Sequence, residues 1–286
     1  MGAELRAELK RRGVPGEIVE TSHSENARDL ARSAQSAVVV AVGGDGTVNE
    51  VANGLVGTNR ILGVLPAGSG NDFRKAIDVP GNWRDALKVL LAEKTSNIDV
   101  GLVECSASPD ASAVASNSHK RYFVNGVGVG FDALVADQTR KIKHLRGAAL
   151  YVLAVLQTIN KYKAPTFTVS IDGASSESRN LLIAIGNGRC AGGGFYLTPH
   201  ARVDDGLLDI CRIDNLSILK ILNLMPKVMG ANHLGSKGVS YANGRTILIS
   251  SKGAFFVHAD GEIIGENSHR VKTEIREKAL NVIVGK

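Results

Sequence analysis

Five residues, Gly43 to Thr47 (GGDGT), restrict the fold of this chain more than any other feature of its sequence. The run before them, residues 37–42 (AVVVAV), predicts a strand buried on both faces, and apolar residues at helical spacing in 47–55 predict a helix after them. Glycines at such a junction let backbone N–H groups approach an anion, and the helix N-terminus adds a favourable field. Asp45 can hold the metal ion of a nucleoside triphosphate or accept from a ribose hydroxyl, and Thr47 can cap the helix or donate to a phosphate. We therefore expect a phosphate-binding turn, with an ordinary tight turn as the alternative.

A second glycine turn, residues 66–73 (PAGSGNDF), follows the next predicted strand at 61–65. Loops at the carboxyl ends of neighbouring parallel strands face one crevice, where open α/β sheets bind ligands. Ser69 and Asn71 can form hydrogen bonds with phosphates, whereas Asp72 fits a functional role and a helix cap equally well. The two turns together predict a single nucleotide site.

The pattern of predicted strands and helices changes at about residue 98. Before it, strands and helices alternate (strands 17–21, 37–42 and 61–65; helices 25–34, 47–55, 71–77 and 83–93). After it come short strands separated by Gly, Ser, Asn or Asp, interrupted by a loop and two helices (strands 98–104, 121–125, 167–172, 180–185, 207–213, 246–250, 255–259 and 279–284; loop 107–118; helices 134–162 and 217–229). We predict an α/β protein: an N-terminal parallel-sheet nucleotide-binding domain (1–97) followed by an antiparallel β-sandwich domain (98–286). The last strand can fold back towards the first domain.

Composition limits the partners and the compartment. A net charge of +6 favours anionic partners, but basic residues without interleaved aromatics argue against nucleic acid. Three widely spaced cysteines form no disulfide framework, which favours a reducing compartment. The longest apolar run, 148–156, is about half the ~20 residues that a membrane span needs, and residues 1–12 have no apolar signal-peptide core. We expect a soluble, cytoplasmic protein.

Several segments together resemble a known family. They are GGDGTVNEVANGL (43–55), PAGSGNDF (66–73), YFVNGVGVGFDA (122–133), IGNGRCAGGGFYLTPHARVDDGLLDI (185–210) and HADGE (258–262). In combination they resemble bacterial diacylglycerol-kinase-type lipid kinases, in a superfamily with sphingosine kinases and NAD kinases, over nearly the whole chain. The resemblance implies an ATP-dependent kinase that transfers the γ-phosphoryl group to a lipid hydroxyl, with diacylglycerol as the foremost acceptor.

The resemblance also implies roles for individual residues. The implied ATP site consists of Thr21, Gly43, Gly44, Asp45, Gly46, Thr47, Asn49, Glu50, Gly68, Ser69, Asn71 and Asp72. Asp260 and Glu262 of the D-G-E motif are implied to supply the general base, with the choice between them open, although Asp-Gly alone is also a common hairpin turn. A Mg²⁺ site is implied at Asp205 with the carbonyls of Arg202 and Leu207, a mixture of oxygens that suits this ion.

Two apolar helices are candidates for the lipid site. One has a predicted apolar face and a basic cluster at its start (Leu145, Ala149, Val152, Leu156 and Ile159; Lys141, Lys143, His144 and Arg146), and the other, 217–229, carries Lys220 and Lys227. Our hypothesis is that they border a lipid groove and contact an anionic membrane at its inner face. The alternative is that they only pack on the sandwich. A homodimer would fit the family.

Some patterns in the sequence suit functions other than a lipid kinase. Gly126 to Gly130 (GVGVG) follows a predicted strand, but Phe131 takes the place of the third glycine of a dinucleotide fingerprint. The histidines show no metal-ligand spacing, so His233 and His258 are expected to be structural. An NAD kinase-like enzyme and a non-catalytic nucleotide- or lipid-binding homologue stay open as alternatives.

One departure from the family pattern lies at the N-terminus. The family's opening strand and its N-P-x-[SA]-G loop have no counterpart, because Met1 begins directly at the following helix. We expect an upstream start, a truncation or a lost strand. Because the family's opening strand lies inside the parallel sheet, a chain without it would lose stability and ATP affinity.

Overall fold

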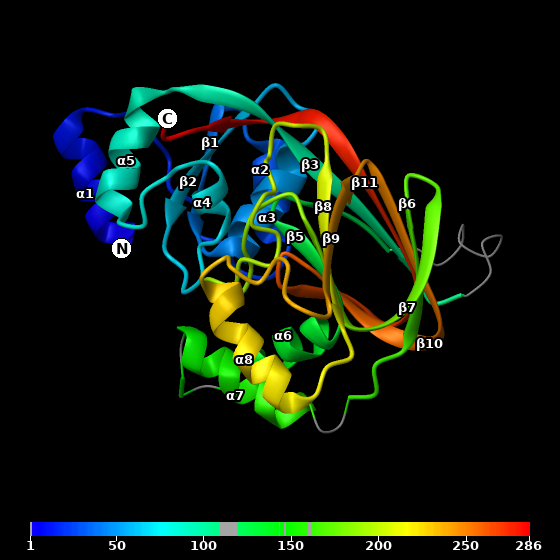
Figure 1. Ribbon diagram of the computed structural model, residues 1–286. Coiled ribbons are helices and arrows are strands. Elements are labelled where there is room, and N and C mark those ends of the chain that lie inside the picture. Colours follow the sequence, from blue (N-terminus) through cyan, green and yellow to red (C-terminus); the bar gives the residue numbers. More distant parts are fainter. Residues whose placement is uncertain (1, 109–118, 143, 146, 160–161) are drawn as a thin grey trace.

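The computed structural model describes residues 2–108, 119–142, 144–145, 147–159 and 162–286 (Figure 1). Its helices are α1 (Gly2–Arg12), α2 (Asn26–Ser33), α3 (Asp45–Leu55), α4 (Phe73–Ala76), α5 (Trp83–Ala92), α6 (Phe131–Lys141), α7 (Gly147–Ile159) and α8 (Ile218–Met229). Its strands are β1 (Val38–Gly43), β2 (Ile61–Pro66), β3 (Thr95–Ser106), β4 (His119–Phe123), β5 (Gly126–Gly130), β6 (Thr166–Ile171), β7 (Ala174–Gly186), β8 (Leu208–Asp214), β9 (Val239–Gly244), β10 (Thr246–Ala259) and β11 (Glu262–Ile283). None of these helices is both long enough and apolar enough to cross a membrane.

The strands form one hydrogen-bonded network of eleven, in which β1-β2-β11-β10-β5-β7-β8-β9 are successive neighbours. In the described part of the chain, only β1 with β2 and β2 with β11 pair in parallel, and every other pair is antiparallel. The expected division into a parallel sheet and a separate sandwich is therefore only partly right. The physical reason is the length of β11, which pairs with β10 and β3 and then reaches β2, where Asn281 lies opposite Ile61. The expected return of the last strand is confirmed.

Two apolar cores pack against different parts of this sheet. In α3 the residues Val48, Val51, Ala52 and Leu55 are buried, as their helical spacing predicts, and they pack in one core with β1, β2 and α5. A second core fills the antiparallel part between β5, β7, β8, β10 and β11. Helices α6, α7 and α8 gather at one end of the molecule, away from α1 and α5 (Figure 1), and bury a smaller cluster around Phe131, Ala154 and Ile221.

Several predicted elements need correction. Residues 17–21 form no strand, since they are mostly exposed and unpaired. Among the described strands, β1 is the edge strand of the sheet and has a neighbouring strand on one edge only. Val40 on this strand is therefore 36% exposed instead of buried. The single helix predicted at 134–162 is divided into α6 and α7. β5, β9 and most of β11 were missed, because their glycines and charged residues hide the strand pattern. The loop predicted at 107–118 lies outside the described residues from 109 onwards.

Candidate active site

The two glycine turns touch each other. A Cβ atom on Gly68 would overlap the Cα of Gly44, so a side chain there would push the turns apart. Asn71 shapes the second turn from a left-handed conformation (φ 51°), because its side chain accepts from the N–H of Gly68 at 2.9 Å and donates to the Gly68 carbonyl at 2.7 Å. The turns thus present two runs of backbone at one place, an arrangement that suits a polyphosphate.

Asp45 and Asp72 link these turns to their surroundings. Asp45 begins α3, and its Oδ1 accepts the backbone N–H of Phe73 at 3.1 Å. Burial, followed by the charges of Asp72 and Asp260, raises the pKa of Asp45 to about 6. Asp72 is 3% exposed and makes no helix-cap hydrogen bond. Instead, it accepts from Lys75 Nζ at 2.8 Å, from Cys190 Sγ at 3.2 Å and from the N–H of Gly193 at 2.6 Å, which joins the turn to the loop after β7.

Asp260 lies in the tight turn between β10 and β11, with a left-handed φ of 48°. Its oxygens accept four hydrogen bonds, from Asn49 Nδ2 at 2.7 Å and from the N–H groups of Val124, Asn125 and Gly126 at 2.8–3.0 Å. Burial raises the pKa of Asp260, and the four donors oppose that increase. A carboxylate has about four acceptor sites, so the protein's own donors occupy them all.

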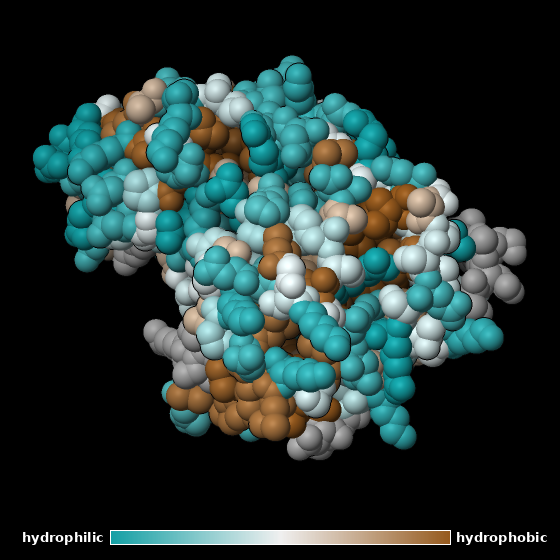
Figure 2. Space-filling model, in the orientation of Figure 1, coloured by the Kyte–Doolittle hydropathy of each residue, from teal (hydrophilic) through white to brown (hydrophobic). Residues whose placement is uncertain are grey.

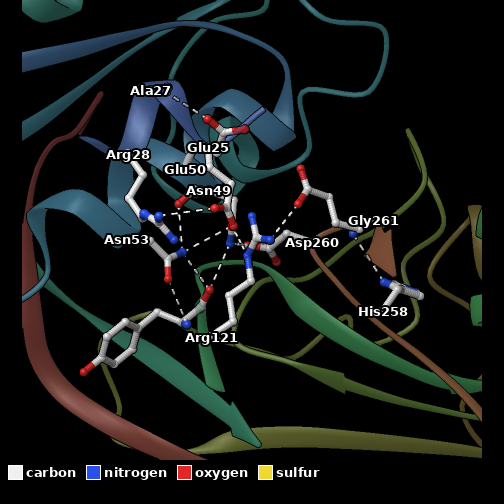
Figure 3. Close-up of polar contacts among 12 residues, drawn as sticks. Glu25, Ala27, Arg28, Asn49, Glu50, Asn53, Arg121, His258, Asp260 and Gly261 are labelled. Atoms are coloured by element: carbon white, nitrogen blue, oxygen red, sulfur yellow. Dashed lines mark hydrogen bonds and ion pairs between the residues drawn. The ribbon is translucent and has the colours of Figure 1, made fainter. Parts of the chain in front are cut away.

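Glu262 has a different environment. It forms an ion pair with Arg121 at 2.7 Å, and Arg121 Nε donates to Asn49 Oδ1 at 2.8 Å. A Cβ atom on Gly46 would lie 3.4 Å from the carboxylate of Glu262. Figure 3 shows that Arg121 and Asp260 both contact the side chain of Asn49, which extends from α3 towards the D-G-E turn. No sequence pattern points to Arg121, because a lone arginine in a strand forms no motif.

His258 and Asp132 form a second polar pair beside Asp260. The distance between His258 Nε2 and Asp132 Oδ2 is 2.9 Å. On the other side of the ring, the N–H of Gly261 donates to His258 Nδ1 at 3.3 Å (Figure 3). Both side chains are mostly buried, at 7% and 16% exposure. His258 was expected to be structural, and Asp132 was not singled out at all. Because these residues are 126 positions apart, only the fold reveals the pair.

A cavity of about 430 Å³ joins these features. Its polar end is lined by both glycine turns and by Asp45, Asp72 and Asp260. Its other end is lined by apolar side chains that come mainly from α6, α7 and α8, among them Phe131, Val135, Val155, Leu181, Ile221 and Leu224. Figure 2 shows apolar side chains gathered over the same helices on the surface. A polar ligand group and a hydrocarbon group therefore fit in one continuous space.

Some of the expected ATP-site residues lie outside this cavity. Thr21 is exposed before α2 and does not line it. Glu50 accepts the N–H of Ala27 at 3.1 Å, and Asn49 is buried at 1% exposure with its amide bonded to the protein. The expectation that Asn49 and Glu50 contact the nucleotide stays a prediction.

The expected Mg²⁺ ligands also lie away from the cavity. Arg202, Asp205 and Leu207 form an exposed turn, in which Asp205 Oδ1 accepts the N–H of Leu207 at 3.1 Å. Buried Asp99 accepts from Gly206 N–H at 2.7 Å and fixes this turn from below. No group of three or more His, Cys, Asp or Glu side chains suited to a metal occurs in the part of the chain that is described. One exposed carboxylate with two carbonyls still fits a hard cation that keeps several waters.

Comparisons with known proteins agree with this architecture. Residues 1–103 match the diacylglycerol kinase catalytic domain, and residues 125–284 match the YegS C-terminal NAD kinase beta sandwich-like domain. A diacylglycerol kinase of Mycobacterium tuberculosis is 30% identical over 261 residues, which cover 90% of this chain and 81% of that protein. A protein of Pectobacterium atrosepticum named "Probable lipid kinase YegS-like" is 31% identical over 82% of this chain and 74% of its own length.

Solved structures share the fold. A diacylglycerol kinase of Bacillus anthracis str. Sterne superposes with a TM-score of 0.68 at 20% identity, over 98% of this chain and 92% of that one. An NAD kinase from Archaeoglobus fulgidus in complex with ATP gives 0.51 at 16% identity, over 98% and 88%. These structures show the fold, whereas the two matched domains and the relatives that are 30% and 31% identical show the family: the chain belongs to the bacterial diacylglycerol kinases and YegS-like lipid kinases.

Proposed function

We propose that this protein transfers the γ-phosphoryl group of ATP to the hydroxyl group of a lipid, with diacylglycerol as the first acceptor to examine. The observation that carries this proposal is the cavity, which begins at the two glycine turns and continues into an apolar chamber. A dinucleotide carries polar groups along its whole length and would bury little apolar surface against the chamber, whereas an acyl chain would fill the chamber with hydrocarbon. The names of the relatives support a lipid kinase as well.

The geometry suits phosphoryl transfer, which depends on positioning and on charge neutralisation more than on covalent chemistry. The backbone N–H groups of the two turns and the N-terminus of α3 would bind the triphosphate, with Ser69 beside them. Asp45 would hold the Mg²⁺ that accompanies ATP, and the charge of this ion would neutralise the phosphates. Asp205 and the carbonyls of Arg202 and Leu207 would hold a further Mg²⁺ that braces their turn. The general-base role of Asp260 and Glu262 stays a prediction, because Asp260 has its acceptor sites filled and Glu262 is paired with Arg121.

The two binding functions fall in successive parts of the chain. We assign ATP binding mainly to residues 1–97 and acceptor binding to residues 98–286, with the cavity between them. A homodimer stays a prediction from the resemblance.

The helices around the apolar chamber would contact the inner face of an anionic membrane. Leu219 on α8 is 76% exposed, and Leu156 on α7 and Met229 on α8 are 42% and 40% exposed. Lys220 and Lys227 lie on α8 as well, so apolar and basic groups share this surface. Lys143 and Arg146, which were expected to join them, lie outside the described residues.

The change Leu219→Glu is expected to weaken binding to vesicles of anionic phospholipid by about tenfold, because it adds a like charge and removes a large exposed apolar group. Sedimentation with vesicles measures the effect. The matched control is Val19→Glu, at an apolar residue that is 54% exposed in the segment between α1 and α2. Equal vesicle binding by the two variants would remove α8 from the membrane contact.

The function itself is tested by transfer of labelled γ-phosphate from ATP to three separate acceptors: diacylglycerol in mixed micelles, sphingosine in mixed micelles, and NAD in buffer. We expect label in diacylglycerol and none in NAD. Label in NAD alone would assign the chain to the dinucleotide branch. Retained ATP binding with no label in any acceptor would support the non-catalytic alternative.

A further inference from the structure

The D-G-E turn is held at two places by one segment of the chain, which runs through β5 into α6. At the start of this segment, three backbone N–H groups donate to the carboxylate of Asp260, and the carbonyl of Gly126 accepts the N–H of Asp260 at 2.8 Å. At its end, Asp132 in the first turn of α6 contacts His258, two residues before Asp260. The segment therefore contacts the acidic residue directly and reaches the rest of the turn through a histidine.

Both ring nitrogens of His258 have a partner. The N–H of Gly261 approaches Nδ1 at 3.3 Å (Figure 3). A backbone N–H can only donate, so Nδ1 carries no proton and the ring proton is on Nε2. Nε2 donates this proton to Asp132 Oδ2 at 2.9 Å. Asp132 thus selects the tautomer in which the ring accepts a hydrogen bond from the acidic turn.

The sheet leaves room for this one arrangement of the ring. His258 on β10 lies opposite Gly128 on β5, and a Cβ atom on Gly128 would overlap both Asp132 Oδ2 and His258 Nε2. The side chains of His258 and Asp132 are only 7% and 16% exposed. Because water reaches so little of either group, a partner that is removed is poorly replaced by solvent.

The backbone of the turn needs such support. Asp260 and Gly261 both have left-handed conformations, with φ of 48° and 84°. A residue other than glycine keeps this conformation only where its surroundings hold it. The bond from Gly261 to the ring is one such contact, and it lies between Asp260 and Glu262 in the sequence. His258, Asp132, Asp260 and Gly261 all line the cavity, so the supported turn faces the space where transfer would occur.

We propose that Asp132 and His258 are positioning residues for phosphoryl transfer. Asp132 keeps the ring proton of His258 on Nε2, which leaves Nδ1 free to hold Gly261. The bond to Gly261 in turn orients the backbone that carries Asp260 and Glu262. This role rests on the proposed lipid kinase function, in which the D-G-E turn supplies the general base. Neither member of the pair takes the proton of the acceptor.

Two amide substitutions of His258 separate the two ring nitrogens. His258→Asn puts an amide oxygen near the position of Nδ1, where it can accept from Gly261, whereas His258→Gln puts an amide nitrogen near the position of Nε2, where it can only donate to Asp132. We expect kcat for transfer to diacylglycerol to stay within about threefold in His258→Asn and to fall about 10- to 100-fold in His258→Gln, with the Kd for ATP unchanged in both. Equal kcat values in the two variants would overturn the role of the Gly261 contact.

Substitutions of Asp132 test whether it acts through the histidine. Asp132→Asn keeps an acceptor oxygen for Nε2 and is expected to retain kcat within about threefold, whereas Asp132→Ala is expected to lower it at least about tenfold. In the His258→Asn background, Asp132→Ala is expected to change kcat by less than about twofold, because no ring tautomer remains to be set. The matched control is Asp137→Ala on the same helix, where Asp137 pairs with Lys141 at 2.6 Å. Equal losses in Asp132→Asn and Asp132→Ala would contradict the role.

Nitrogen NMR of the His258 ring at pH 8 tests the pair without any acceptor. We expect the wild type to carry its proton on Nε2 and Asp132→Ala to show a mixture of both tautomers. A proton on Nδ1 in the wild type would overturn the proposal, whatever the enzyme transfers. If the wild type labels a lipid and all the variants do so equally well, the positioning role is wrong and the lipid kinase function stands. If the wild type labels no lipid, the proposed function fails, and the role in transfer fails with it.

Discussion

Replacement of Asp45 by Asn is expected to abolish phosphoryl transfer and, at the same time, to stabilise the fold at alkaline pH. The pKa of Asp45 is raised from its ordinary value of 3.8 to about 6, mainly by burial. The folded state therefore binds a proton more tightly than the unfolded state, and stability falls as the pH rises from about 4 through 6. Ionised Asp45 costs about 3 kcal/mol at pH 8, and Asn removes that cost while it still accepts from Phe73.

Urea unfolding at pH 8 and at pH 4 measures this effect. We expect the free energy of unfolding of Asp45→Asn to exceed that of the wild type by about 3 kcal/mol at pH 8 and nearly to equal it at pH 4. Asp85→Asn is the control, because Asp85 is exposed and, among the described residues, forms an ion pair with Lys88 alone. If the variant were less stable than the wild type at pH 8, the ionised carboxylate of Asp45 would stabilise the fold, and the expected cost of its charge would be wrong.

Asp260→Asn is expected to have the opposite effect on stability, although it also removes transfer activity. An amide has one acceptor oxygen, so its NH₂ group would face two of the four donors that now meet Asp260. Leaving buried donors unpaired should lower the free energy of unfolding by about 3 kcal/mol. The D-G-E turn would then separate from α3, because Asn49 loses its partner.

Thermal unfolding and the transfer assay, run on one preparation, measure the two effects of Asp260→Asn. The control is Asp214→Asn in β8. In the part of the chain that the structure describes, the carboxylate of Asp214 accepts a side-chain hydrogen bond from the neutral Asn180 alone. We expect that control to change the free energy of unfolding by no more than about 0.5 kcal/mol. Unchanged stability in Asp260→Asn would mean that the four donors find other partners.

The sequence predicted those parts of the site whose chemistry is local. The glycine turns between β1 and α3 and between β2 and α4 are short motifs with their own backbone requirement, and the structure brings them into contact as expected. Their place at the ends of two neighbouring parallel strands follows from the alternation of strands and helices. The return of the last strand was also predictable, because 279–284 reads as a buried strand.

The rest of the site depends on contacts between distant residues. Arg121 reaches Glu262 and Asn49 only because β4 lies beside α3, and the pairing of Asp132 with His258 requires β5 against β10. Most of β11 alternates charged and apolar residues without a continuous apolar run, so its length of 22 residues was hidden. The same strand turns two expected sheets into one, which no local pattern could show.

The central claim is that the apolar chamber holds the acceptor while the glycine turns hold ATP, and the most direct measurement compares two neighbouring tryptophan substitutions on α7. Val155 lines the cavity at 7% exposure, whereas Leu156 does not line it and is 42% exposed. We predict that Val155→Trp lowers kcat/KM for diacylglycerol at least tenfold, with the Kd for ATP unchanged, and that Leu156→Trp changes neither quantity. Equal lipid phosphorylation by the two variants would contradict the account, because the acceptor would then have to bind elsewhere.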